Sequence, residues 1–221
     1  MPTVEQVRER YLNKAERNGV NDGIAVDKLR FSLLYNEAGK KFLTLHLQNR
    51  GVDDVRYIQK FLKLKHKVPY ESKSIDGKVY NFPLPKDYFD LADAEARATK
   101  GKCSHTINLV EIQTENYTEI IQDEFWKPSF EWEEAPYTIN SDNLSVYVSD
   151  FTISDILLNY YRYPVQLKLL DETDPESDFT PDSIIEWDEK SLDDVITLMV
   201  MNLDINSNNP RYNLQTIRLQ K

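Results

Sequence analysis

The spacing of apolar residues changes twice along the 221-residue chain, and this change constrains the fold more than any other sequence feature. Helical spacing runs through residues 1–63, strand-forming residues and turn signals dominate 64–170, and helical spacing returns over 183–205. An acidic loop at 171–182 and a terminal arm at 206–221 complete the chain. The sequence therefore predicts one α+β structural unit. We expect an N-terminal helical hairpin, a central antiparallel β-sandwich-like body, and a C-terminal helix with an extended arm.

Capping signals mark where the predicted helices begin. Thr3 and Gln6 stand at the spacing of a capping box, in which each side chain accepts a hydrogen bond from the backbone of the other. Asp27 can cap the second helix in the same region. The C-terminal helix can be capped by Ser191 or by Asp188, and the sequence leaves that choice open.

The central region contains several short segments with strand-forming composition. Residues 87–100 could form a strand or a helix, because Tyr88 and Phe89 favour a strand whereas the alanines of 92–96 favour a helix. Residues 116–125 predict a short inserted helix. The candidate strands are residues 65–72, 78–82, 104–112, 138–139, 145–148 and 164–169.

Composition excludes several classes of protein. A single cysteine, Cys103, rules out an internal disulfide and a cysteine-rich zinc site, which suits a reducing cytoplasm. The 37 acidic and 27 basic side chains give a net charge of −10, which opposes general binding to DNA. No stretch approaches the roughly 20 apolar residues that span a bilayer, and we expect no signal peptide and no membrane partner.

A search for catalytic chemistry favours ordinary structural roles. Cys103 and His105 could form a nucleophile or half a metal site, but activation needs a defined cleft and an orienting third group, so we expect an ordinary strand neighbourhood. The acidic loop lacks the glycine and the terminal glutamate of a calcium loop. Acidic pairs at the starts of helices are explained by the helix dipole. We therefore expect no enzyme, no cofactor and no metal. The carboxylate pairs considered are Asp53-Asp54, Glu133-Glu134 and Asp193-Asp194.

One basic cluster could contact phosphate groups, because aromatic residues alternate with cations there. A polar face of the sheet, or contact with an acidic neighbouring subunit, explains the same pattern equally well. The cluster consists of Lys60, Lys63, Lys65, His66 and Lys67, with Phe61 and Tyr70.

Three segments, in chain order, resemble phage connector proteins. Residues 77–89 (GKVYNFPLPKDYF) look like the strand, "LP-x-D-Y" turn and strand of tail-tubular and connector ring proteins of short-tailed phages. Val146-Tyr147, followed by residues 158–164 (LNYYRYP), resembles the "Y-x-R-x-P" strand that closes the same β domain. Residues 183–185, the helix at 193–203 and the arm at 208–212 are similar to ring proteins of crAss-like phages.

The resemblance implies a structural virion protein. Such a subunit forms a closed homo-oligomeric ring, expected to be a dodecamer, under the portal protein in the head–tail connector. It continues the DNA exit channel, which DNA crosses during ejection without specific binding, and it docks neighbouring ring or tail proteins. Assembly would take place in the cytoplasm of the host bacterium. The resemblance also favours a strand for residues 87–100.

The second helix carries apolar residues on more than one side, and the arm is too poor in apolar residues to fold alone. Both segments are therefore candidate interfaces. A frayed terminus is the alternative for the arm. Alternative functions are another tail adaptor, baseplate or fibre-attachment protein, then a cell-wall hydrolase using carboxylates such as Glu131, Glu133 and Glu134, and last a regulatory DNA binder. The candidate interface residues are Phe31, Leu34, Tyr35, Phe42, Arg211, Tyr212, Leu214, Ile217 and Leu219.

Overall fold

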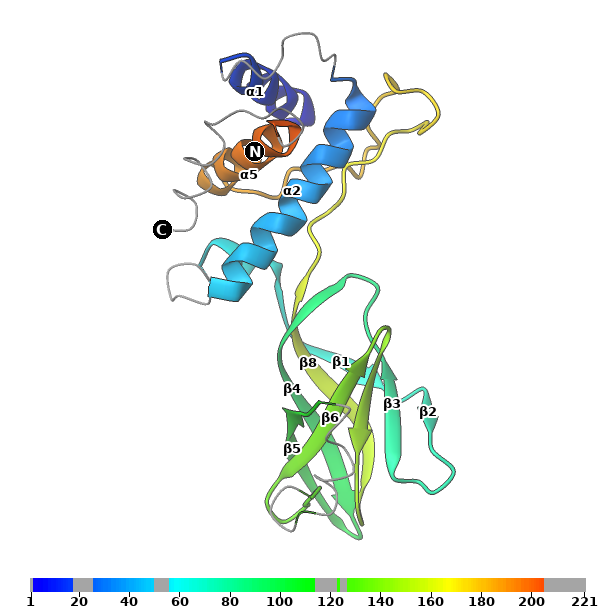
Figure 1. Cartoon of the computed structure of the whole chain (residues 1–221). Coiled ribbons are helices and arrows are strands. Elements are labelled where there is room, and N and C mark those ends of the chain that lie inside the picture. The colour runs from blue at the N-terminus through cyan, green and yellow to red at the C-terminus, as the bar shows by residue number, and fades with distance from the viewer. Residues whose placement is uncertain (1, 18–25, 50–55, 114–122, 124–126, 205–221) are drawn as a thin grey trace. The chain divides into compact units, whose positions relative to one another are not determined.

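In a computed structural model, the chain divides into two compact units (Figure 1). The helical unit combines the described parts of Met1–Lys60 and Pro164–Lys221, and the sheet unit is Phe61–Tyr163. The sequence predicts one structural unit overall, whereas the sheet unit is inserted in the sequence between two halves of the helical one. The structure describes residues 2–17, 26–49, 56–113, 123 and 127–204.

Three long helices form the helical unit: α1 (Val4–Arg17), α2 (Lys28–Asn49) and α5 (Glu189–Asp204). Both α1 and α2 pack against α5, so the helix near the C-terminus lies beside the two N-terminal ones (Figure 1). The two helices of the predicted hairpin, α1 and α2, therefore belong to a cluster of three helices. Within the described residues, no helix combines the length and apolar content needed to cross a membrane.

The predicted helix caps are confirmed. Thr3 and Gln6 form a reciprocal capping box: the Gln6 N–H donates to Thr3 Oγ1 at 3.3 Å, and the Thr3 N–H donates to Gln6 Oε1 at 3.0 Å. Asp27 Oδ1 accepts a backbone N–H of the first turn of α2 at 2.6 Å. The choice at α5 is settled in favour of Asp188, because its Oδ1 accepts the Ser191 N–H at 2.7 Å.

Trp187 is the centre of the helical core. It is 1% exposed, and its ring meets that of Phe42 edge-on, with centroids 5.2 Å apart. On α2, a Cβ added at Gly39 would lie 3.3 Å from Trp187 Cζ2 and 3.6 Å from Pro164 Cγ. Glycine therefore lets the helix approach the indole closely. These contacts join α2 to the segment that returns from the sheet unit.

We predict that Trp187→Ala lowers the free energy of unfolding by about 3–5 kcal/mol, because it leaves a large cavity between α2 and this segment. Denaturant titration followed by far-ultraviolet circular dichroism measures the change. Trp132→Ala is the matched control: Trp132 is 60% exposed, and its loss should change stability by no more than about 0.5 kcal/mol. Equal losses in the two variants would contradict the central role of Trp187.

The sheet unit contains eight strands in the order β1-β8-β4-β5-β6-β7-β3-β2. Strands β1 and β3, from opposite halves of this order, approach each other, so the sheet is curled. All neighbours are antiparallel except β5 and β6, which are parallel. The strands are β1 (Leu62–Pro69), β2 (Ser72–Lys73), β3 (Val79–Pro83), β4 (Tyr88–Lys100), β5 (Cys103–Glu111), β6 (Glu134–Asn140), β7 (Asn143–Tyr147) and β8 (Thr152–Arg162).

The α+β class is confirmed, but the purely antiparallel body is wrong, because β5 and β6 run parallel. Residues 112–133 separate these strands, and a connection of that length permits the crossover that parallel pairing needs. The helix expected at 116–125 lies almost entirely outside the described residues. Residues 87–100, left open between strand and helix, form β4 from Tyr88 onward.

The strand expected at 164–169 is wrong apart from an isolated bridge between Leu169 and Phe179. The backbone groups of Leu167 bond instead to a side chain: the Leu167 N–H donates to Asn36 Oδ1 at 2.8 Å, and Asn36 Nδ2 donates to Leu167 O at 2.9 Å. Asn36 thus satisfies both backbone groups as a neighbouring strand would. The resemblance at 158–164 predicts the last part of β8 as a strand, whereas the local pattern misses its start, because β8 carries apolar residues on both faces and lacks simple alternation.

Candidate functional site

A cavity of about 690 Å³ lies in the sheet unit where two turns meet. One turn, residues 84–87, connects β3 to β4, and the other is the tip of the β6–β7 hairpin. Its volume is in the range of sites that hold a small molecule or several side chains. The lining residues are Glu71, Pro83, Leu84, Pro85, Lys86, Tyr88, Phe89, Ser141, Asp142, Asn143 and Tyr163.

A backbone hydrogen bond joins the two turns: the Leu84 N–H donates to Asp142 O at 2.8 Å. Asn140 pairs with Asn143 across the hairpin, which leaves Ser141 and Asp142 as a two-residue loop. Ser141 has φ +43°, in the left-handed region that such tight hairpin loops use. The hairpin tip is therefore fixed against the β3–β4 turn rather than extending freely from it.

Aromatic side chains and prolines supply the apolar wall of the cavity. The rings of Phe89 and Tyr163 meet edge-on, with centroids 4.8 Å apart. Burial, with smaller contributions from the carboxylates of Asp90 and Glu111, raises the pKa of Tyr88 to about 12. Its phenol therefore stays neutral at physiological pH and can serve as a hydrogen-bonding group in an apolar surface.

Asp87 holds the β3–β4 turn in place. Its carboxylate accepts Lys63 Nζ at 2.6 Å and the Tyr160 hydroxyl at 3.0 Å, and its carbonyl accepts the Tyr163 N–H at 2.8 Å. Burial opposes ionisation of Asp87, but the hydrogen bonds from Lys63 and Tyr160 outweigh it and hold its pKa below the usual value. The turn is thereby tied to both β1 and β8.

We predict that Asp87→Asn lowers the free energy of unfolding at pH 7 by roughly 1 kcal/mol, because it removes a charged acceptor shared by two donors. Since the pKa of Asp87 is lower in the folded chain, its contribution is complete above the unfolded pKa of about 3.9 and is lost as pH falls through the folded pKa. The difference between the two proteins in urea titrations should therefore shrink below about pH 4.

The matched variant for this measurement is Tyr160→Phe, which removes only the neutral donor to Asp87 and should cost less than Asp87→Asn. A difference between Asp87→Asn and the parent chain that stays constant from pH 7 to about pH 3 would contradict the role of the ionised carboxylate.

The predicted basic cluster is not one uncompensated patch. Lys63 pairs with Asp87, and Lys67 Nζ lies 3.4 Å from the Asp155 carboxylate, whose side chain is 8% exposed. Lys65 occupies a bulge of the edge strand β1 with φ +52°. Lys60 belongs to the helical unit. Compensation by buried or neighbouring carboxylates weakens the case for a phosphate-binding surface.

The other candidates for chemistry also lie in structural settings. Cys103 is exposed and unbonded, and His105 Nδ1 lies 3.7 Å from Glu133 Oε1 at the surface. A hydrogen bond from Lys100 lowers the pKa of Glu131, whereas a general acid needs a raised one. Within the described ranges, no group of three or more His, Cys, Asp or Glu side chains could hold a metal ion.

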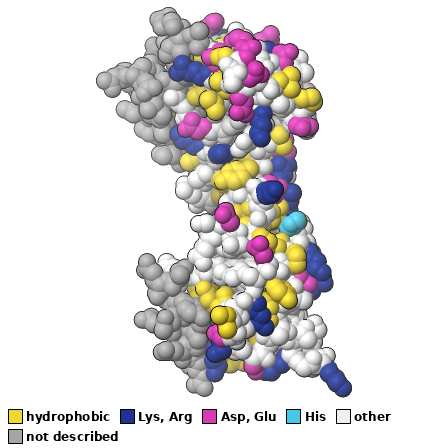
Figure 2. Space-filling model, turned by 90° about the vertical axis from the view of Figure 1, so that its right-hand side faces the viewer, with side chains coloured by type: hydrophobic (Ala, Val, Ile, Leu, Met, Phe, Trp, Pro, Cys, Tyr) yellow, Lys and Arg dark blue, Asp and Glu magenta, His cyan; other side chains and the backbone are white. Residues whose placement is uncertain are grey.

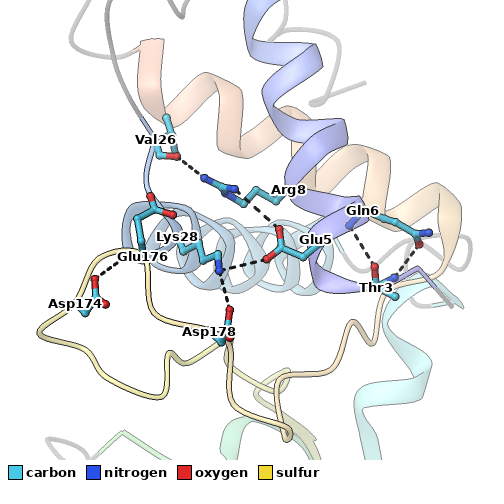
Figure 3. Close-up of polar contacts among 9 residues, drawn as sticks. All are labelled: Thr3, Glu5, Gln6, Arg8, Val26, Lys28, Asp174, Glu176 and Asp178. Carbon is cyan, nitrogen blue, oxygen red and sulfur yellow. Dashed lines mark hydrogen bonds and ion pairs between the residues drawn. The ribbon is translucent and has the colours of Figure 1, made fainter.

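The acidic loop at 171–182 is tied to the start of α2 (Figure 3). Lys28 Nζ lies 2.9 Å from Asp178 Oδ1 and 3.7 Å from Glu5 Oε1, and the Leu29 N–H donates to Pro175 O at 3.1 Å. Figure 2 shows acidic side chains gathered over the upper end of the view, on the helical unit. These contacts give the acidic loop a defined path along the helical unit.

The interface candidates on α2 need correction. Phe31 is fully buried, and Tyr35 and Phe42 are 2% exposed, so they have no free surface for a second chain. Phe31 packs on Tyr11 of α1, which explains why α2 carries apolar residues on more than one side. Leu34 is half-buried. The arm candidates Arg211, Tyr212, Leu214, Ile217 and Leu219 lie outside the described residues.

No protein-family model matches the chain, and no curated protein matches it. The cavity was not among the predicted sites. Two signals mark its walls in the sequence, the Leu84–Tyr88 turn and the Ser141-Asp142 loop, but their meeting depends on the order of the strands. The candidate site is therefore a cavity defined by tertiary structure.

Proposed function

We propose that the chain is a structural, non-enzymatic virion protein that forms a ring in the portal-proximal connector between a phage capsid and its tail. One observation carries the proposal. The segment at 77–89 that resembles connector ring proteins forms β3, the following turn and the start of β4, and it supplies six of the eleven residues that line the cavity. A resemblance in sequence thus falls on a surface suited to binding.

A binding role fits the chemistry of the described residues better than a catalytic one. The cavity is lined by aromatic residues, prolines and a few polar groups, which is typical of recognition sites. Glu131 and Glu133, the carboxylates considered for hydrolysis, are exposed and pair with Lys100 and His105. Their exposure gives no means of driving two carboxyl pKa values apart, as acid–base hydrolysis requires.

Charge supports a channel wall to which DNA does not adhere. The sheet unit contains 11 Lys and Arg against 17 Asp and Glu, and the remaining residues contain 16 against 20. Each unit is therefore net negative, at −6 and −4, and like charge opposes lasting contact with phosphate. DNA could then pass through the ring during ejection without specific binding.

Ring formation follows from a head-to-tail contact whose rotation closes. We propose a dodecamer beneath the portal protein, docking the next ring or tail component on its far side. Assembly takes place in the host cytoplasm. The same fold would also serve another tail adaptor, baseplate or fibre-attachment protein, and the position of the chain in the particle separates these functions.

Cryo-electron microscopy of the intact particle tests the proposal. We expect rotationally symmetric density next to the portal into which both units fit, each in one copy per subunit. Density for the chain at a baseplate or fibre, or anywhere outside a closed ring, would overturn the connector assignment.

We further predict that the purified chain does not bind duplex DNA in a strongly salt-dependent manner. Because both units are net negative, a fluorescence anisotropy titration with a labelled duplex should give a Kd weaker than about 10⁻⁴ M at physiological salt, the weak limit of non-specific DNA binding. Micromolar affinity that falls steeply between about 50 and 200 mM salt would favour a DNA-binding function instead.

A further inference from the structure

The cavity in the sheet unit combines apolar walls with an acidic rim. Glu71 and Asp142 line it and are exposed, and neither carboxylate has a side-chain partner among the described residues. Lys86 is the single cation in the lining. Pro83, Leu84, Pro85, Tyr88, Phe89 and Tyr163 provide the apolar surface. Such a site suits a segment that carries both positive charge and large apolar side chains.

The chain itself contains such a segment. Residues 206–221 (NSNNPRYNLQTIRLQK) carry three basic residues and no acidic one, in a chain whose net charge is −10. The same segment contains Tyr212, Leu214, Ile217 and Leu219, which are too few to form a core alone but suit insertion into an apolar site. The positive charge of the segment thus complements the acidic rim of the cavity, and its apolar side chains complement the apolar walls.

We propose that the cavity of one copy of the chain binds residues 206–221 of a second copy. Sixteen residues in a fully extended conformation span at most about 55 Å, which sets the reach of the segment. The two surfaces, segment and cavity, differ from each other, so the contact is head-to-tail and forms a ring when the rotation between copies closes. This contact rests on the proposed function, which supplies the arrangement of the copies in a ring. The contact is what links one copy to the next.

Peptide binding to the full chain tests the contact. The probe is a fluorescein-labelled peptide of residues 206–221, followed by anisotropy at about 0.1 M salt, where exposed charges are screened beyond about 10 Å. We expect saturable binding. The Glu71→Lys, Asp142→Lys double variant should bind about tenfold more weakly, because it reverses both rim carboxylates. Glu134→Lys, an exposed carboxylate of the same unit outside the cavity, is the control and should bind normally.

A second peptide separates insertion from simple charge attraction. Replacing its Tyr212, Leu214, Ile217 and Leu219 by serine keeps every charge, and we expect binding to be lost. Equal binding of both peptides, no binding of the native peptide, or no effect of the double variant would overturn the inference. Circular dichroism of each variant confirms that it is folded.

Photo-cross-linking in the full chain identifies the copy that provides the segment. A photoreactive phenylalanine analogue replaces Tyr212 in unlabelled chain, which is mixed with ¹⁵N-labelled parent chain. We expect adducts with residues 83–89 of the labelled copy. Adducts confined to the unlabelled chain's own cavity would overturn the exchange between copies.

Failure of this contact and failure of the ring are distinguishable. A ring with empty cavities in the particle overturns only the contact, whereas cross-linked copies that lie outside a closed ring overturn only the connector assignment.

Discussion

The burial of Trp187 against Gly39 is the constraint on which the helical unit depends, because it fastens the returning segment of the chain to α2. Charge acts in the same direction. Residues 1–60 contain 11 basic and 8 acidic side chains, whereas 164–204 contain 2 and 12, so the two halves of the unit attract each other. Exposed ion pairs such as Arg10 with Glu189 contribute little stability individually. Together they favour the observed packing of residues 1–60 against residues 164–204 over other arrangements of these segments.

Sequence patterns predicted the helices and most strands because their signals are local. Capping at Thr3 and Asp27 needs only neighbouring residues, and both predictions are confirmed. Nonlocal features were missed. The parallel pairing of β5 with β6 has no local signature, and the strand-like segment 164–169 pairs with the Asn36 side chain instead of a strand. Fold class was therefore accessible from sequence, but sheet order was not.

Residues 88–100 show how tertiary structure decides an ambiguous segment. Alanine favours helices in isolation, yet Ala94, Ala96 and Ala98 alternate into the sheet core and are at most 2% exposed. Their small side chains fill the inner face of the curled sheet, where larger ones would crowd the opposite strands.

The interface prediction at Phe31 failed for a related reason: apolar residues on two sides of α2 meet α1 and the segment 164–204, both from the same chain.

The cavity could not be predicted from sequence, because its walls come from turns more than 50 residues apart that one backbone hydrogen bond joins. Hydrogen bonds hold both turns in place. Asp87 fixes one turn to β1 and β8, and the two-residue hairpin loop fixes the other, so little conformational entropy remains to be lost on binding. When a cavity is preformed, only the bound segment loses conformational entropy on binding. A short segment with few apolar residues can therefore bind such a cavity. In the proposed contact between copies, the turns that line the cavity would set the geometry, and the length of residues 206–221 would absorb differences in spacing.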